Sequence, residues 1–302
     1  MDEKFLVIGL GEVLWDLLPS GKVLGGAPTN FAYMSTALGD EGVVASRIGN
    51  DSLGHAAQAR LGELGLNTAY LQKDSRFQTG SATVSIDDGG QPTFAIAEPS
   101  AWDYLEWTAD WRNLASRADI ICFGSLAQRS PVSLETITRF LEHARPEALR
   151  IFDVNLRQSY YSAAILRDSL SRADIVKLTE HELTILACEL CLDEVDEKGL
   201  ALALLDEYEL KLVCITRGAN GSMLVSRHEC VGHPGYAVRV VDAVGAGDAF
   251  TACLAHHFIR GYSLQEISRY ANRFASWVAT QPGATPTMKQ PEVQHLLQIC
   301  KT

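Results

Sequence analysis

One stretch of the chain, Val240–Arg260, combines residues that could do chemistry with a pattern that would position them. Its apolar residues fall at helical spacing, so we expect a helix to begin at Gly245-Ala246-Gly247, with Asp248 in its first turn. The first N–H groups of a helix lack partners within it, the helix dipole adds positive charge there, and glycines let a ligand approach the backbone. The stretch therefore predicts either an ordinary capped helix or an anion site with a carboxylate general base, which would suit phosphoryl transfer to a hydroxyl.

Size and composition indicate a globular protein with a large core. The 302 residues are 47% hydrophobic and 21% charged, and we treat residues 1–302 as one domain. The formal net charge of −11 argues against a nucleic-acid partner, which would favour a basic surface. No run reaches the roughly 18 apolar residues of a membrane helix, and the acidic start resembles a first strand more than a signal peptide, so we expect a cytoplasmic protein with no membrane partner.

Strand and helix patterns alternate along most of the chain, which predicts a mostly parallel sheet covered by helices on both faces. The expected strands are 5–9, 42–46, 120–124, 150–154, 175–178 and 211–216. The expected helices are 30–38, 53–64, 132–143, 162–171, 180–188, 199–208, 264–280 and 291–299, besides the one that begins near Gly245.

Two turn-rich segments, residues 12–25 and 79–106, interrupt this alternation. They contain short alternating strands, and residues 87–90 predict a hairpin turn between two of them. We expect these segments to form a small antiparallel sheet that acts as a lid over the carboxyl ends of the parallel strands, where ligands of such folds bind.

Other familiar motifs are incomplete. Gly9-Leu10-Gly11 lacks the third glycine of a dinucleotide fingerprint because Leu14 occupies its place, and the chain has no P-loop. Cys188-x-x-Cys191 has no second cysteine pair or suitably spaced histidines, so we expect two buried helical thiols rather than a redox or zinc site.

A second informative segment runs from Leu24 to Ala32, where Gly25-Gly26 precedes a helix start that carries Asn30. Together with the distant run Asp242–Asp248, this segment resembles the paired signature of the ribokinase-like (PfkB) carbohydrate kinases. The resemblance extends over nearly the whole chain through segments in the family's order, namely 11–16, 49–54, 101–103, 153–157 and 215–218, and it is strongest with bacterial fructokinases.

The resemblance implies a three-layer α/β/α fold and assigns roles to individual residues. Asp248 corresponds to the family's catalytic base, and Gly245, Ala246 and Gly247 correspond to its anion hole. The matching sugar contacts are Asp16, Gly26 and Asn30, and Arg157 would neutralise phosphate or hold substrate.

For ATP, the matching positions are Thr216, Gly218, Gly221 and Asn272; the alternative for Asn272 is a surface residue of an amphipathic helix. Glu180 corresponds to the acidic residue that organises Mg²⁺ through water. Lys177 replaces the family's asparagine three residues earlier and could meet phosphate oxygens directly. Asp242 and the carbonyls near Gly283 match a site for K⁺.

The resemblance therefore implies an ATP-dependent sugar kinase, with fructose as the expected acceptor. Alternatives are 2-keto-3-deoxygluconate, whose carboxylate Arg157 could hold, or another small sugar such as ribose. A sugar-binding paralogue without catalysis is a third interpretation, although such a protein could have lost Asp248, which is present here. Exposed lid edges leave a homodimer through the lid as a hypothesis.

Overall fold

The computed structural model describes residues 3–19, 21–86, 92–194, 196–288, 292–293 and 296. The expected turn at residues 87–90 and most of the expected helix at 291–299 lie outside this part of the chain. The strands of the larger sheet are β1 (Leu6–Leu10), β4 (Glu41–Gly49), β5 (Leu71–Asp74), β8 (Ile120–Gly124), β9 (Leu149–Asp153), β10 (Ile175–Thr179), β11 (Leu212–Thr216), β12 (Ser222–Val225) and β13 (Cys230–His233). The helices are α1 (Ala27–Leu38), α2 (Ser52–Glu63), α3 (Ala109–Arg117), α4 (Pro131–His143), α5 (Ala163–Arg172), α6 (Glu180–Leu190), α7 (Glu197–Glu207), α8 (Ala246–Phe258) and α9 (Leu264–Ala279).

The larger sheet has the strand order β13-β12-β11-β10-β9-β8-β1-β4-β5. In this spatial order, the strands from β11 through β1 to β5 all run parallel. At the other edge, β12 pairs antiparallel with β11, and β13 pairs antiparallel with β12. All five residues of β1 are buried, as expected for a central strand with helices on both faces. The mostly parallel sheet is confirmed; the four-residue strands β5, β12 and β13 and the short polar helix α3 were not predicted.

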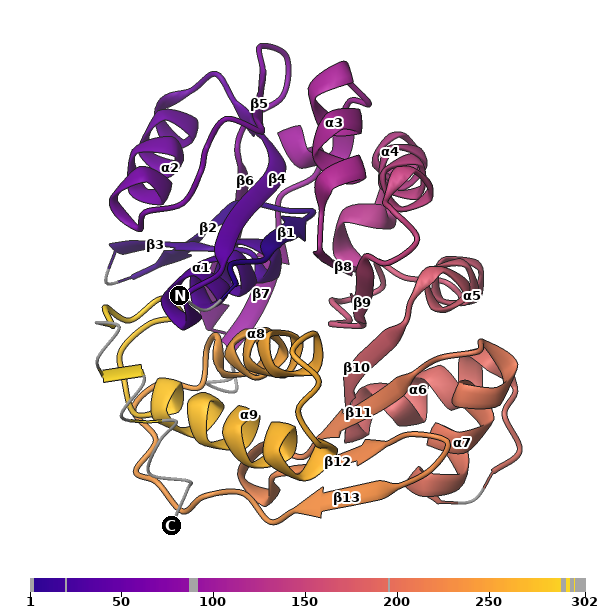
Figure 1. The fold of residues 1–302 in the computed structure, drawn as a ribbon. Coiled ribbons are helices and arrows are strands. Elements are labelled where there is room, and N and C mark those ends of the chain that lie inside the picture. Colours follow the sequence, from indigo (N-terminus) through magenta and orange to yellow (C-terminus); the bar gives the residue numbers. More distant parts are fainter. Residues whose placement is uncertain are drawn as a thin grey trace.

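Helices cover both faces of this sheet (Figure 1). Alternate side chains of the strands enter two separate cores: Ile8 and Phe152 pack with α3–α7 on one face, whereas Val7 and Ile151 pack with α1, α2, α8 and α9 on the other. The predicted three-layer α/β/α arrangement is therefore confirmed. No helix within the described ranges is both long and apolar enough to span a bilayer.

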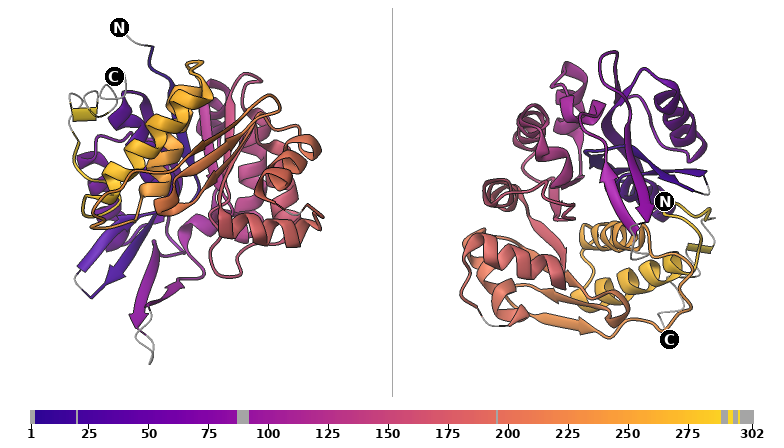
Figure 2. Two further views of the ribbon diagram at one scale, coloured as in Figure 1. Left: turned by 90° about the horizontal axis from the view of Figure 1, so that it is seen from below. Right: turned by 180° about the vertical axis from the view of Figure 1, so that it is seen from behind.

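A smaller sheet projects from the body of the molecule (Figure 2). It contains β2 (Leu14–Leu18), β3 (Gly21–Gly25), β6 (Gly80–Ile86) and β7 (Pro92–Ile96), in the order β3-β2-β6-β7. The position of this second sheet in the two turn-rich segments is confirmed, but its expected all-antiparallel pairing is wrong, because β2 pairs with β6 in parallel. These two strands come from different segments, so no hairpin constrains their relative direction.

The start of α1 lies unusually close to β1. A Cβ atom at Gly9 would lie 2.0 Å from the Pro28 carbonyl oxygen, and one at Gly26 would lie 2.4 Å from the Glu12 carbonyl oxygen. Gly26 also has a φ of 106°, which side chains disfavour. The glycine of the incomplete dinucleotide motif thus serves helix packing, and this packing brings the α1 N-terminus to the carboxyl edge of the sheet.

The cysteine pair differs from expectation. Cys188 and Cys191 are both exposed, so the expected burial of these thiols is wrong. Cys191 lies beyond the last turn of α6 with a φ of 57°, where the chain turns outward. The buried residues of α6 are Glu182, Leu183, Leu186 and Leu190, so Cys188 lies on the outer side of this helix and Cys191 lies just past its end.

The contact between β1 and α1 yields a stability prediction. Gly9→Ala should lower the free energy of unfolding by about 1–3 kcal/mol, because the added methyl group forces the Pro28 carbonyl away. Gly62→Ala is the matched control: it lies within α2 with open space at its Cβ position, and it should stabilise the fold by roughly 0.5–1 kcal/mol. Urea denaturation of both variants measures this, and equal stability of the two would contradict the packing argument.

Candidate active site

The centre of the candidate site is the N-terminus of α8, above the carboxyl ends of the parallel strands. Gly245 caps this helix with a φ of 79°, and a Cβ atom there would lie 2.7 Å from the Cα atom of Ala284. The sequence therefore needs glycine here both for the backbone conformation and for close contact with the following loop. The first-turn N–H groups of α8 form an electropositive end, where we expected Gly245, Ala246 and Gly247 to form an anion hole; the Ala246 N–H donates to the Ala243 carbonyl oxygen at 3.2 Å.

Asn30 and Asp248 meet at this end. The Asn30 Nδ2 group donates to Asp248 Oδ2 at 2.7 Å, although 218 residues separate the two in the chain. The other amide atom, Asn30 Oδ1, is buried with no hydrogen-bond partner in the described part of the chain. A buried acceptor without a donor is costly, so this oxygen is free to accept a hydrogen bond from a hydroxyl group of a bound ligand.

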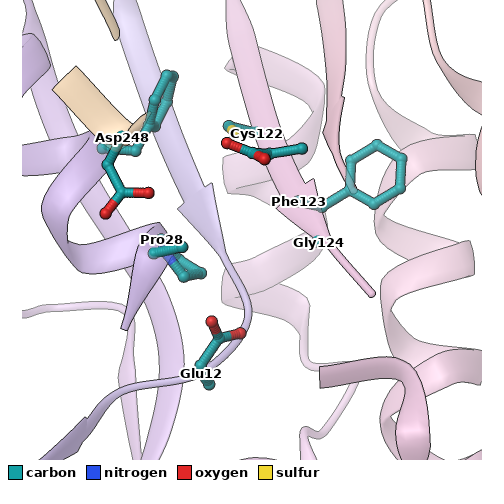
Figure 3. A pocket seen from close by; sticks show the side chains of 9 residues that line it. Glu12, Pro28, Cys122, Phe123, Gly124 and Asp248 are labelled. Atoms are coloured by element: carbon teal, nitrogen blue, oxygen red, sulfur yellow. The ribbon is translucent and has the colours of Figure 1, made fainter. Parts of the chain in front are cut away.

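A narrow pocket lies beneath these groups (Figure 3). Its lining residues are Glu12, Ala27, Pro28, Phe31, Cys122, Phe123, Gly124, Asp153 and Asp248. The carboxyl groups of Glu12 and Asp248 reach into it on either side of Pro28. Its volume of about 10 Å³ is close to that of one water molecule, so a sugar ring would lie above this recess rather than inside it.

Burial perturbs both carboxyl groups. Desolvation, with a smaller contribution from the Asp153 carboxylate, raises the pKa of Asp248 to about 6, against the opposing effects of Asn30, Lys177 and Arg157. Desolvation raises the pKa of Glu12 to about 7, although its own N–H and that of Ala27 donate to the carboxyl group. Asp248 thus remains ionised at pH 7.5 but is far more basic than an ordinary aspartate, as a general base requires.

Glu12 was missed by the sequence reasoning. It belongs to the segment Gly11–Asp16 that carried the resemblance, yet no role was assigned to it. Its carboxyl group accepts from the first turn of α1, and the N-cap residue Gly26 has no side chain to do so. A carboxylate that directly follows a buried strand and a glycine was the available signal.

Lys177 lies beside Gly247, one of the residues expected to form the anion hole. Its Nζ atom lies 3.1 Å and 3.3 Å from the two carboxylate oxygens of Asp153, and 3.1 Å from the position that a Cβ atom at Gly247 would take. Burial alone would lower the pKa of Lys177, but the carboxylates of Asp153, Glu182 and Asp248 outweigh burial and raise it. The ammonium is therefore charged at neutral pH and close to any phosphate bound at the α8 N-terminus. Asp153 was a further residue to which the sequence reasoning gave no role.

Asp16 and Arg157 lie at the outer part of the site. Asp16 is half-buried in β2, and a Cβ atom at Gly25 would lie 2.7 Å from its Oδ2 atom, so Gly25 makes room for this carboxylate. Burial raises the pKa of Asp16, and the positive charge of Arg157 opposes the rise. Arg157 is exposed in the loop after β9, and its charge also acts on Glu12 and Asp248.

The residues expected on the nucleotide side lie along β11, β12 and α9. Thr216 ends β11, Gly218 and Gly221 have positive φ values, and a Cβ atom at Gly221 would lie 2.0 Å from the His233 carbonyl oxygen. Asn272 is only 5% exposed, so the alternative of a surface residue is wrong. Its Nδ2 group donates to Ser222 Oγ and to the Ser268 carbonyl oxygen, both at 2.7 Å, which joins β12 to α9.

The expected metal residues lie on separate elements. Glu180 is exposed in the first turn of α6, directly after β10. Asp242 accepts hydrogen bonds from the N–H groups of Val244 and Gly283, so it joins the two loops that flank the α8 N-terminus. Across the described ranges, no three His, Cys, Asp or Glu side chains gather closely enough to hold a metal ion together.

A doubly covered parallel sheet, a small second sheet, and a helix N-terminus beside a basic carboxylate are typical of kinases that transfer a phosphoryl group to a small molecule. Residues 20–291 match the family model described as pfkB family carbohydrate kinase, and the chain belongs to this family. It is a sugar kinase, as its sequence predicted.

Individual relatives agree with this assignment. The chain is 32% identical over 263 residues to a fructokinase from Escherichia coli, with 81% of each protein covered. It is 28% identical over 294 residues to a fructokinase from Vibrio alginolyticus, with 91% of this chain and 92% of the relative covered. The structure of a fructokinase from Xylella fastidiosa with bound ATP superimposes with a TM-score of 0.85 at 26% identity, covering 98% of this chain and 99% of that one.

The raised pKa of Asp248 predicts a pH-dependent cost to stability. Because the group ionises near pH 3.8 in the unfolded chain but only near 6 in the folded one, the folded state binds more protons between these values. Ionised Asp248 therefore destabilises the fold as pH rises from about 4 to 7. Asp248→Asn should match wild type in free energy of unfolding at pH 4 and exceed it by roughly 3 kcal/mol at pH 8.

Chemical denaturation at both pH values measures this difference. Glu147→Gln, which removes a carboxylate from an exposed loop, is the control and should change the free energy of unfolding by less than about 0.5 kcal/mol. A stability difference between Asp248→Asn and wild type that is the same at pH 4 and pH 8 would show that Asp248 is not desolvated.

Proposed function

We propose that the protein is an ATP-dependent fructokinase. The observation that carries the proposal is the 2.7 Å hydrogen bond between Asn30 and Asp248 at the N-terminus of α8, because it unites a polar sugar contact, a base and an anion site. The relatives named fructokinase, together with the ATP-bound fructokinase structure, support fructose and ATP as the substrates.

Asp248 acts as the general base in this proposal. It removes the proton from the attacking hydroxyl group of the sugar while that oxygen bonds to the γ-phosphorus and the bond to the bridging oxygen of ADP breaks. Asn30 donates to the carboxylate and so fixes its orientation, and its free Oδ1 accepts from a second sugar hydroxyl. Asp16 accepts from hydroxyl groups on the lid side, and Gly26, which packs on the Glu12 backbone, holds the start of α1 beside the ring.

The N–H groups of Gly245, Ala246 and Gly247 and the ammonium of Lys177 stabilise the negative charge of the transferred group. Arg157 supplies further positive charge from the rim. Thr216, Gly218 and Gly221 bind the nucleotide, and Asn272 supports that side by joining β12 to α9.

The metal assignments are proposals on the same basis. Glu180 is exposed, which suits an acidic group that holds Mg²⁺ through water. The bound Mg²⁺ would neutralise phosphate charge. Asp242 already joins the loops at Val244 and Gly283, whose carbonyl groups would be the remaining ligands for K⁺.

We further propose that all 302 residues act as one kinase domain in the cytoplasm, with the lid closing over the sugar to exclude water. The lid sheet has β3 and β7 at its edges, so a homodimer through the lid is the assembly that we infer. Molar mass in solution, measured by light scattering, tests the dimer, and a monomeric mass would exclude it.

The experiment that tests the function is ADP release from Mg·ATP with fructose, glucose, ribose, 2-keto-3-deoxygluconate and fructose 6-phosphate. We expect kcat/KM for fructose to exceed that for each other acceptor by at least about 10-fold, the smaller end of pocket discrimination. A preference for the keto-acid would instead assign Arg157 to its carboxylate and overturn fructose as the substrate. ADP release that no acceptor accelerates would overturn the kinase proposal.

A further inference from the structure

Asp153 stands out because it belongs to the site yet touches neither the expected base nor the expected sugar contacts directly. It is the last residue of β9, in the middle of the sheet, and is only 3% exposed. In the parallel pairing of β9 with β10, Asp153 lies beside Lys177, so both side chains point to the same face of the sheet. That face is the one covered by α8.

The contacts of Asp153 form a continuous chain to the anion hole. Its two oxygens lie 3.1 Å and 3.3 Å from Lys177 Nζ. Its Oδ2 atom also lies 3.0 Å from Thr251 Oγ1, and this hydroxyl lies 3.0 Å from the Gly247 carbonyl oxygen. The carboxylate thus connects β10 to α8 at the turn that begins with the anion-binding amides.

Lys177 has a hydrogen-bonding group to spare. An ammonium has three N–H donors, and its hydrogen bonds within the described ranges are with Asp153. The ammonium also lies 3.1 Å from the Cβ position of Gly247, a position that only glycine leaves open. The two oxygens of Asp153 occupy two of the three donors, and the missing side chain of Gly247 leaves space on the other side of the ammonium. The third donor is therefore directed toward Gly247.

A purely structural ion pair explains this arrangement poorly. Burying an ammonium and a carboxylate costs much of the attraction between them, so apolar residues would stabilise the same position as well or better. Apolar side chains would, however, leave no charge at the anion hole. The desolvation cost of the Lys177–Asp153 pair therefore indicates a role in the reaction.

We propose that Asp153 is a positioning residue for phosphoryl transfer, which holds the Lys177 ammonium beneath Gly247 so that the ammonium meets the transferred phosphoryl group. This assignment rests on the proposed kinase function. If a neutral side chain replaces the Asp153 carboxylate, the flexible Lys177 side chain can adopt several rotamers. The ammonium charge is then no longer fixed at one point.

A double-mutant cycle in kcat tests the assignment. Asp153→Asn preserves size and the contact with Thr251 but removes the charge, and we expect kcat with Mg·ATP and fructose to fall about 10- to 100-fold with a KM for fructose within about 3-fold of wild type. In a Lys177→Met background, the same substitution should lower kcat by less than about 3-fold further, because the group through which Asp153 acts is already gone.

Asp174→Asn is the matched control. Asp174 pairs with Lys211 at 2.9 Å and accepts from the Arg150 N–H, at the opposite ends of the same strands, so its loss should leave kcat unchanged. Asp153→Asn should also move the acid limb of the kcat–pH profile to lower pH, since the Asp153 charge contributes to the raised pKa of Asp248. A role in folding alone would not shift that limb.

Each outcome decides the question. Wild-type kcat in Asp153→Asn, or an equal loss with and without Lys177, overturns the assignment while leaving the kinase function intact. If Asp153→Asn does not fold, the double variant Asp153→Asn/Lys177→Met is compared with Lys177→Met instead, because the double variant contains neither buried charge. Equal kcat in these two variants supports the assignment, and a further large loss of kcat in the double variant overturns it. A wild-type protein that phosphorylates no sugar overturns the proposed function and this inference with it.

Discussion

The hydrogen bond between Asn30 and Asp248 is the constraint on which the site depends. It forms only if the first turns of α1 and α8 lie side by side at the same edge of the sheet. α1 reaches this position because Gly9 and Gly26 let it approach β1 and the Glu12 backbone. α8 reaches it because Gly245 turns the chain against the loop at Ala284. The two motifs are therefore far apart in sequence but form one structural unit.

The buried charges of this unit favour catalysis but destabilise the fold. Glu12, Asp153 and Asp248 share one narrow pocket, with the buried cation Lys177 beneath it. Desolvation makes Asp248 a stronger base, and the same desolvation makes its ionised form costly to the fold. Sugar hydroxyl groups would donate hydrogen bonds to these carboxylates, and the Lys177 ammonium would pair with the phosphoryl charge. A stability–activity conflict of this kind is typical of catalytic sites.

Much of the architecture could be predicted because buried parallel strands such as β8 are continuous apolar runs, and helices such as α4 show clear apolar periodicity. The parallel pairing of β2 with β6 could not be predicted, because it depends on how two distant segments of the chain meet. Asp248, Asn30 and Lys177 were found through motifs, and the structure brings them together. Glu12 and Asp153 were not found in this way. Glu12 had a signal in its place after a buried strand and a glycine, but its burial became clear only in the structure, and the importance of Asp153 follows from cross-strand register, which no single-sequence pattern records. The exposure of Cys188 likewise depends on which side of α6 packs against the core, and that of Cys191 on where the helix ends.

The most direct test of the account is the single-turnover rate of phosphoryl transfer from Mg·ATP to fructose in Asp248→Asn at pH 7.5, with both substrates saturating. The account predicts a loss of roughly 10²–10⁴-fold, the usual range for a general base, in a variant whose fold and ATP affinity are unchanged. A rate within a few-fold of wild type would contradict the central claim that Asp248, fixed by Asn30 at the anion hole, is the base.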